Sequence, residues 1–264
     1  MKLLLAQLKP EQDLWENVEI VRSVLKEYSS DIYIFPELFL SGYSAGDEII
    51  EIAEEVEEAV RELSKAAGER LLVIGGPEKE SEGRIYNTAY ALGAVEHRYR
   101  KHFLPNHLPF LEKLRFHPGR GEEAFEYHSR KIGLMVCYDV FFPEIARRYA
   151  VQGVDLLITI SASPFGRSVY FDTFVTARAL ESGAFHAYVN RVGVEGNLNF
   201  RGGSRVISPD GRTIALLPRL HESEDLEKIA IVEIDKKDLR AARLAAPMIR
   251  DLRFSPRYEK RLNF

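Results

Sequence analysis

Short runs of apolar residues alternate along this chain with longer stretches in which apolar residues recur every three or four positions. The short runs predict buried strands, and the longer stretches predict amphipathic helices. Strands are expected at residues 2–8, 31–35, 71–75, 85–93, 124–128, 132–137, 154–161, 186–192, 203–207, 213–217 and 229–234. Helices are expected at residues 14–28, 47–67, 143–152 and 168–183, with a short basic helix capped by Asp235. This interleaving predicts an α/β fold in which helices cover a core of two mixed sheets.

Two stretches lack a clean period. Residues 98–119 carry three prolines with aromatic residues between them, which predicts a long structured loop with a short helix, and such loops are usually functional. The last twenty residues are basic and aromatic. We therefore expect a single domain over residues 1–244 and a tail over 245–264 that docks on a partner subunit.

Composition narrows the class of protein. The net charge is −4 and the isoelectric point is near 6.0, which gives no support to a general nucleic-acid binder. The single cysteine excludes an internal disulfide framework and fits a reducing compartment. The opening apolar run is broken at Gln7 and Lys9, and no stretch reaches the ~20 apolar residues of a spanning helix. We expect a soluble, cytoplasmic protein without membrane contact, whose high charge content resembles thermophile compositions.

The one cysteine, Cys137, ends an apolar run and is followed by a turn and a helix that starts at Pro143. Nucleophiles are often presented in this way, at the end of a buried strand. Cysteine is also among the most buried residue types, so this stretch alone leaves catalyst and structural thiol as even alternatives.

Three other positions combine charge with apolar surroundings. Glu37 follows a buried strand, where a carboxylate held away from water suits a general base. Lys101 lies where basic residues run into an apolar loop, and a lysine near a thiolate favours that thiolate and stabilises an oxyanion. Glu112 lies in a second loop rich in proline and aromatic residues. Each of them alone could equally be a surface group.

Together these segments resemble the nitrilase, or carbon–nitrogen hydrolase, superfamily. Three segments match its signatures in the family's order: Phe35-Pro36-Glu37, Tyr99-Arg100-Lys101, and Cys137-Tyr138-Asp139 with Phe142-Pro143-Glu144. Weaker matches follow at residues 177–181, 190–193 and 202–204. The resemblance implies a four-layer α-β-β-α sandwich, assembly as a homodimer or higher homo-oligomer, and chemistry without cofactor or metal.

The resemblance also implies roles for individual residues. Glu37 would be the general base, Lys101 the cation that stabilises the oxyanion, Cys137 the nucleophile and Glu112 an additional glutamate beside the lysine. The backbone N–H of Tyr138 would be a second oxyanion donor. The substrate pocket is expected to involve Tyr43, Phe141, Phe142, Ser163 and Phe165. Phe141 stands where many family members carry arginine, so it either makes the pocket more apolar or simply packs.

Further local similarity, at residues 40–43, 101–106, 110–112 and 161–165, is to the glutaminase domain of glutamine-dependent NAD synthetases. The chain shows no room for a synthetase domain and no phosphate-binding glycine loop, which favours a free-standing amidase. We expect it to hydrolyse a small carboxamide to acid and ammonia through a cysteine thioester.

Several alternatives stay open. A nitrilase or an N-carbamoyl amidohydrolase would use the same residues on a small nitrile or carbamoyl substrate. A catalytically silent scaffold that binds other proteins would have no need of all four charged and thiol groups. A papain-like protease needs a histidine partner, and none of the seven histidines stands in a recognisable protease context. The four histidines of residues 97–117 lack metal-ligand spacing.

Overall fold

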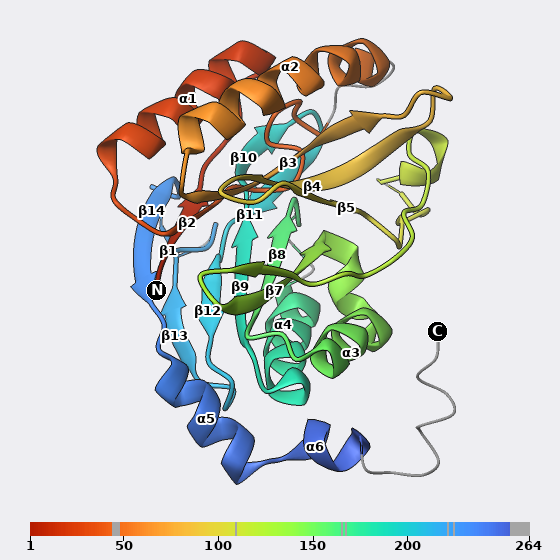
Figure 1. Ribbon diagram of the computed structural model, residues 1–264. Coiled ribbons are helices and arrows are strands. Elements are labelled where there is room, and N and C mark those ends of the chain that lie inside the picture. Colours follow the sequence, from red (N-terminus) through yellow and green to blue (C-terminus); the bar gives the residue numbers. More distant parts are fainter. Residues whose placement is uncertain are drawn as a thin grey trace.

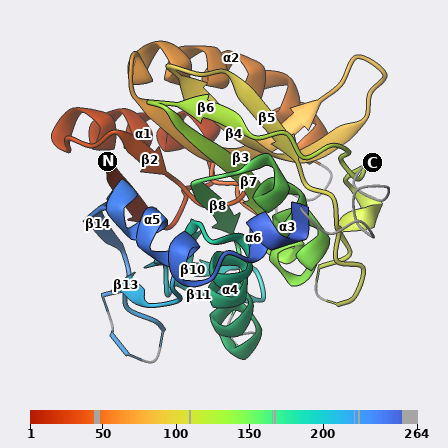
Figure 2. The same cartoon turned by 60° about the horizontal axis from the view of Figure 1, so that its bottom comes forward.

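Two six-stranded β-sheets lie face to face, and helices cover the outer face of each (Figures 1 and 2). The computed structural model describes residues 1–43, 48–108, 110–164, 166, 168–220, 222–223 and 225–253. The predicted four-layer α-β-β-α sandwich is confirmed.

The first sheet has the strand order β14–β1–β2–β3–β4–β5. Its strands are β1 (Lys2–Gln7), β2 (Ile32–Ile34), β3 (Leu71–Lys79), β4 (Ile85–Gly93), β5 (His97–Arg100) and β14 (Lys228–Glu233). β1, β2 and β3 are parallel, and the remaining pairs are antiparallel. Helices α1 (Leu14–Glu27) and α2 (Ile49–Ala67) cover its outer face (Figure 1).

The second sheet has the order β13–β12–β9–β8–β7–β6. Its strands are β6 (Phe125–Tyr127), β7 (Arg130–Val136), β8 (Leu156–Ser161), β9 (Phe185–Asn190), β12 (Arg205–Ile207) and β13 (Thr213–Leu216). β7, β8 and β9 are parallel, and helices α3 (Pro143–Gln152) and α4 (Ser168–Ser182) cover the outer face (Figure 1). A separate hairpin of β10 (Val192–Glu195) and β11 (Leu198–Arg201) follows β9.

Strand alternation builds the layers. In β1, Leu3 and Leu5 point to the core between the sheets, whereas Leu4 packs with α1 and α2. Ile132 and Leu134 of β7 enter the same central core from the second sheet. Both faces of these parallel strands are thus buried, as expected for a sheet between a helix layer and another sheet.

The helix boundaries follow capping chemistry. Asp13 accepts hydrogen bonds from the backbone N–H groups of Trp15 and Glu16 at 2.7 and 3.0 Å, which starts α1. Pro143 occupies the first turn of α3, where a missing N–H costs nothing. Asp235 caps α5 (Lys236–Ala245), as predicted.

The structure corrects the sequence interpretation in three places. β5 lies at the start of the predicted loop. Its four residues form a strand because they pair with β4, although they contain no apolar run that would predict one. The hairpin β10–β11 was not predicted, because each of its strands has only four residues. The strands are joined at Gly196, which has a positive φ angle. The tail holds a helix, α6 (Met248–Arg253), where no period was seen.

Other predictions stay untested. Residues 254–264 lie outside the described residues, so docking of the tail on a partner subunit remains a prediction. Within the described part of the chain, no helix is long and apolar enough to span a membrane.

Candidate active site

Three strand ends carry the residues for which the sequence predicts chemistry. Glu37 lies in the turn after β2, Lys101 directly follows β5, and Cys137 directly follows β7. The first two strands belong to one sheet and the third to the other, so the site joins the two sheets.

Lys101 links two carboxylates. Its Nζ donates to Glu37 Oε1 and to Glu112 Oε1, both at 2.7 Å. Lys101 and Glu37 are fully buried, and Glu112 is 2% exposed. An ammonium group has three protons, so these two bonds leave one N–H for a substrate atom. The structure thus brings together three of the four predicted charged and thiol residues by direct contact.

Burial and charge act in opposite directions in this network. Burial alone would lower the pKa of Lys101, but the carboxylates of Glu112 and Glu37 outweigh burial and raise it. For Glu112, burial raises the pKa, the Lys101 ammonium opposes this, and the Glu37 carboxylate adds to it. Tyr43 also donates its hydroxyl to Glu112 Oε1. Lys101 therefore stays charged, and the pKa of the Glu112 carboxyl lies above its usual range.

Glu37 is held by groups that sequence reasoning missed. Its Oε1 also accepts from Asn87 Nδ2 at 2.8 Å, and its Oε2 accepts from the backbone N–H of Ala162 at 2.7 Å. Gly75 of β3 permits this placement, because a Cβ there would lie 2.4 Å from the backbone nitrogen of Leu38 and 2.7 Å from Glu37 Cα. The Glu37 carboxylate is therefore held by Lys101 after β5, by Asn87 of β4 and by Ala162 after β8.

Cys137 begins the 3₁₀ turn η3 (Cys137–Phe141) with a φ of 46°, in the left-handed region that non-glycine residues avoid. Leu38 and Leu111, the neighbours of Glu37 and Glu112, also have positive φ angles of 48° and 38°. Such backbone costs of order 1–3 kcal/mol per residue and tends to occur at functional sites.

The thiol of Cys137 is protonated at rest. Burial raises its pKa strongly, the Glu37 carboxylate raises it further, and the Lys101 ammonium lowers it. A protonated thiol needs a base to become a nucleophile. Tyr138 lies in the first turn of η3, where backbone N–H groups have no acceptor within the helix.

Asp139 ties the cysteine turn to the lysine loop. Its Oδ1 accepts from the backbone N–H of Phe103 at 2.8 Å, and its Oδ2 accepts from Tyr99 Oη at 2.9 Å and Val136 N at 3.1 Å. The carboxyl is fully buried, and burial raises its pKa to about 7 although these hydrogen bonds oppose the shift. Asp139 belongs to the matched segment Cys137-Tyr138-Asp139, but its neighbours in the sequence did not predict these contacts.

This raised pKa has a consequence for stability. A carboxyl that binds its proton more tightly when folded stabilises the protein fully below its unfolded pKa, and that stabilisation is lost as the pH rises through about 7. Relative to Asp139→Asn, which cannot ionise, the wild type should lose about 2–3 kcal/mol of unfolding free energy between pH ~5 and ~8. Urea unfolding of both proteins across this range measures the difference. Parallel pH profiles would contradict a titrating Asp139.

A cavity of about 40 Å³ opens beside the thiol. Its lining combines the cysteine turn, the loops after β2, β5 and β8, and the start of α4: Tyr43, Pro105, His107, Phe110, Glu112, Cys137, Tyr138, Phe141, Ser163, Pro164 and Phe171. Of the residues predicted for the substrate pocket, Tyr43, Phe141 and Ser163 line this cavity. His107, Phe110 and Phe171 were missed, because segments far apart in the sequence bring them to the cavity only in the folded chain.

Two predicted pocket residues do not line this cavity. The ring of Phe142 stacks on Phe103 with centroids 3.5 Å apart, and this packing takes it away from the cavity wall. Phe165 lies outside the described residues. Phe141 does both things that the sequence left open: it lines the cavity, and its ring packs within 5.6 Å of Tyr138, Tyr170, Phe171 and Phe174.

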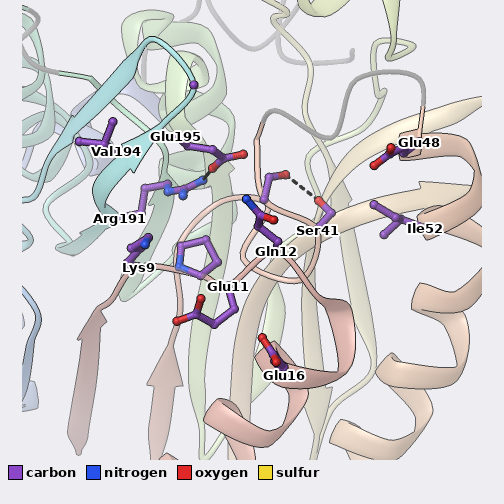
Figure 3. A pocket seen from close by; sticks show the side chains of 13 residues that line it. Lys9, Glu11, Gln12, Glu16, Ser41, Glu48, Ile52, Arg191, Val194 and Glu195 are labelled. Atoms are coloured by element: carbon purple, nitrogen blue, oxygen red, sulfur yellow. Dashed lines mark hydrogen bonds and ion pairs between the residues drawn. The ribbon is translucent and has the colours of Figure 1, made fainter.

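A larger cavity, of about 560 Å³, is lined by Ser41 and Gly42, which precede Tyr43 in the loop after β2 (Figure 3). Lys9 and Glu11, before α1, and Glu16, in its first turn, line this cavity, and Arg191 reaches into it beside its ion-pair partner Glu195. None of the residues with predicted chemistry lines this cavity. One hydrogen bond links the walls of the two cavities: Glu195 Oε1, in the larger one, accepts from the backbone N–H of Tyr43 at 2.7 Å.

Known proteins are similar to this chain in sequence and in fold. The sequence profile described as "Carbon-nitrogen hydrolase" matches residues 3–244. An (R)-stereoselective amidase from Pseudomonas sp. is 31% identical over 229 residues, which cover 85% of this chain and 80% of the amidase. The glutamine-dependent NAD(+) synthetase of Aquifex aeolicus is 32% identical over 256 residues, which cover 92% of this chain but only 44% of the synthetase.

A solved amidase extends the likeness to three dimensions. The Nesterenkonia sp. AN1 amidase, from the nitrilase superfamily, matches with a TM-score of 0.82 and 26% identity over 100% of this chain and 97% of its own. In that structure of a mutant amidase, the acetamide moiety of fluoroacetamide is attached to the active-site cysteine.

Proposed function

Because the chain belongs to the carbon–nitrogen hydrolase family, we propose that it hydrolyses a small carboxamide to a carboxylic acid and ammonia through a thioester on Cys137. The observation that carries this proposal is the buried Lys101 ammonium held between Glu37 and Glu112, next to the cavity of the thiol. A cation fixed by two carboxylates cannot leave the site when charge develops on a substrate.

The first half-reaction forms the acyl-enzyme. Glu37 takes the thiol proton as Cys137 Sγ attacks the amide carbon, and the carbonyl oxygen becomes an oxyanion. The remaining N–H of Lys101 and the backbone N–H of Tyr138 stabilise that oxyanion, each by about 3 kcal/mol. As the tetrahedral intermediate collapses, the C–N bond breaks, Glu37 returns its proton to the nitrogen, and ammonia leaves.

The second half-reaction releases the acid. Water attacks the thioester carbon while Glu37 takes one of its protons, and the same two donors stabilise the second oxyanion. The C–S bond then breaks, and the proton on Glu37 returns to the sulfur. Glu112 and Tyr43 take no proton in this scheme; Glu112 holds the Lys101 ammonium, and the Tyr43 hydroxyl holds Glu112.

The cavity indicates the kind of acyl group. Its volume of about 40 Å³ holds only a few water-sized groups. Among its described lining residues there is no arginine or lysine, so an α-carboxylate of glutamine or asparagine would lack a counter-ion there. Five of its eleven described lining residues are phenylalanine or tyrosine. This favours a short apolar acyl chain.

We therefore expect ammonia release from propionamide or isobutyramide to exceed that from glutamine by at least ~10-fold in kcat/KM. The assay should also include asparagine, an N-carbamoyl amino acid and propionitrile, the nitrile matched to propionamide. Faster hydrolysis of the nitrile would assign the chain to the nitrilase alternative, and faster hydrolysis of glutamine would contradict the apolar pocket.

A further inference from the structure

Three arginine side chains surround one aspartate where α4, β11 and β12 meet. Asp172 of α4 is 2.6 Å from Arg205 Nη2, 3.1 Å from Arg219 Nη1 and 3.6 Å from Arg201 Nη2. Arg201 ends β11, Arg205 begins β12, and Arg219 follows β13. We call these four residues the arginine cluster.

The arginine cluster is buried and carries excess positive charge. Arg201 is 1% exposed and Arg205 is 4% exposed, while the side chains of Arg219 and Asp172 are 18% and 31% exposed. Glu222, on the exposed rim, forms a further ion pair: its Oε1 lies 4.0 Å from Arg219 Nε, and its Oε2 accepts from the Arg219 backbone N–H at 3.0 Å. Three guanidinium groups thus share one inner carboxylate, and burial of unbalanced charge is costly. Burial accordingly lowers the pKa of Arg205, against the raising effect of Asp172.

The buried donors of this cluster lack acceptors. Within the described part of the chain, none of the three guanidinium nitrogens of Arg201 makes a hydrogen bond, and neither does Arg219 Nε. Arg205 Nε donates to the Gly203 carbonyl at 3.0 Å. Its Nη2 lies 2.6 Å from Asp172 Oδ1 but at angles unsuited to a hydrogen bond, so these two groups form an ion pair only. Each buried donor without an acceptor costs about 1–3 kcal/mol, so native proteins rarely leave several in one place.

We propose that the arginine cluster is a binding site for a small oxyanion, of the phosphate, sulfate or carboxylate type. Guanidinium groups bind such ions through paired N–H donors, and Arg201 has three nitrogens that make no hydrogen bond to the described residues, next to two further cations. Asp172 orients Arg205 and Arg219 while leaving the net charge positive. One bound oxyanion would satisfy Arg201 and bring the cluster close to neutrality.

This site lies directly behind the wall of the catalytic cavity. The Arg201 guanidinium lies 5.9 Å from the ring centre of Phe171, and the Arg201 backbone N–H approaches the Ser163 carbonyl at 3.4 Å. Phe171 and Ser163 both line the cavity beside Cys137. A bound oxyanion would therefore fix two residues of the substrate pocket without touching substrate itself.

Thermal unfolding of the full chain tests the proposal without measuring activity, so its outcome is independent of the proposed function. Inorganic phosphate is titrated against chloride at constant ionic strength. The wild type should show a saturable rise in Tm of about 5 °C at ~100 times Kd. Arg201→Met, which keeps the length of the side chain, should lose this saturable rise. Arg212→Met is the matched control, because that arginine is 72% exposed and pairs only with Asp210 among the described residues.

The phosphate-free buffer supplies a second readout. There, Arg201→Met should unfold at a higher temperature than the wild type, because it removes a buried charge without an acceptor. If that variant does not fold, Arg219→Gln replaces it, and calorimetric titration of phosphate into the wild type should give one site per chain.

Three outcomes would overturn the proposal. A phosphate effect of equal size in the wild type and both methionine variants would be a general salt effect. A calorimetric titration without a saturable phosphate site would show that the arginine cluster does not bind this oxyanion. Self-association that Arg201→Met weakens, without any saturable phosphate effect, would assign the guanidinium groups to an acidic group of a second copy of the chain.

Discussion

Replacement of Lys101 by methionine is expected to abolish most hydrolytic activity and to lower the free energy of unfolding by about 3–5 kcal/mol. The variant leaves Glu37 and Glu112 facing each other, both buried, without the ammonium that now bonds to each at 2.7 Å. It also removes an oxyanion donor, which alone should reduce kcat by about 10²–10³-fold. Urea unfolding and steady-state ammonia release measure the two effects separately.

Lys113→Met is the matched control, because Lys113 is the exposed neighbour of Glu112 and makes no contact with the buried network. The double variant Lys101→Met with Glu112→Gln should recover part of the stability, since only one stranded carboxylate remains, but not the activity. If Lys101→Met were as stable and active as the control, the lysine would have neither role.

Substitution of Cys137 by alanine should reduce amide hydrolysis by about 10⁴-fold or more while the protein stays folded. The thiol is small and its loss leaves the hydrogen-bond network of Lys101 intact, so near-wild-type Tm is expected. Alkylation of the native thiol by iodoacetamide gives a second readout. If iodoacetamide failed to alkylate Cys137 and Cys137→Ala had the same hydrolysis rate and Tm as the wild type, the alternative of a catalytically silent scaffold would be favoured.

The sequence predicted what depends on local pattern. Alternating and continuous apolar runs located most strands of the two sheets, because burial on one or both faces leaves a period that can be read directly. Glu37 and Cys137 could be found for the same reason: each follows such a run. Lys101 could be found from its motif, although the strand that positions it was taken for a loop.

What the sequence did not reveal depends on contacts between distant segments. Asn87 and Ala162 hold Glu37 from residues far along the chain, and neither has a local signature. Asp139 stands in a recognised motif, yet its function as a link between Tyr99, Phe103 and Val136 appears only in three dimensions. Phe142 looked like a pocket residue because it neighbours Phe141, but its side chain stacks on Phe103 instead.

Trapping of the acyl-enzyme tests the central role of Cys137 most directly. The protein is mixed with a good amide substrate, quenched in acid within one turnover, and examined by intact-mass and peptide mass spectrometry. A mass increase equal to the acyl group, on the peptide that contains Cys137 and absent from Cys137→Ala, is the predicted result. Rapid ammonia release with an unmodified Cys137 at every quench time, or with the acyl group on another residue, would contradict it.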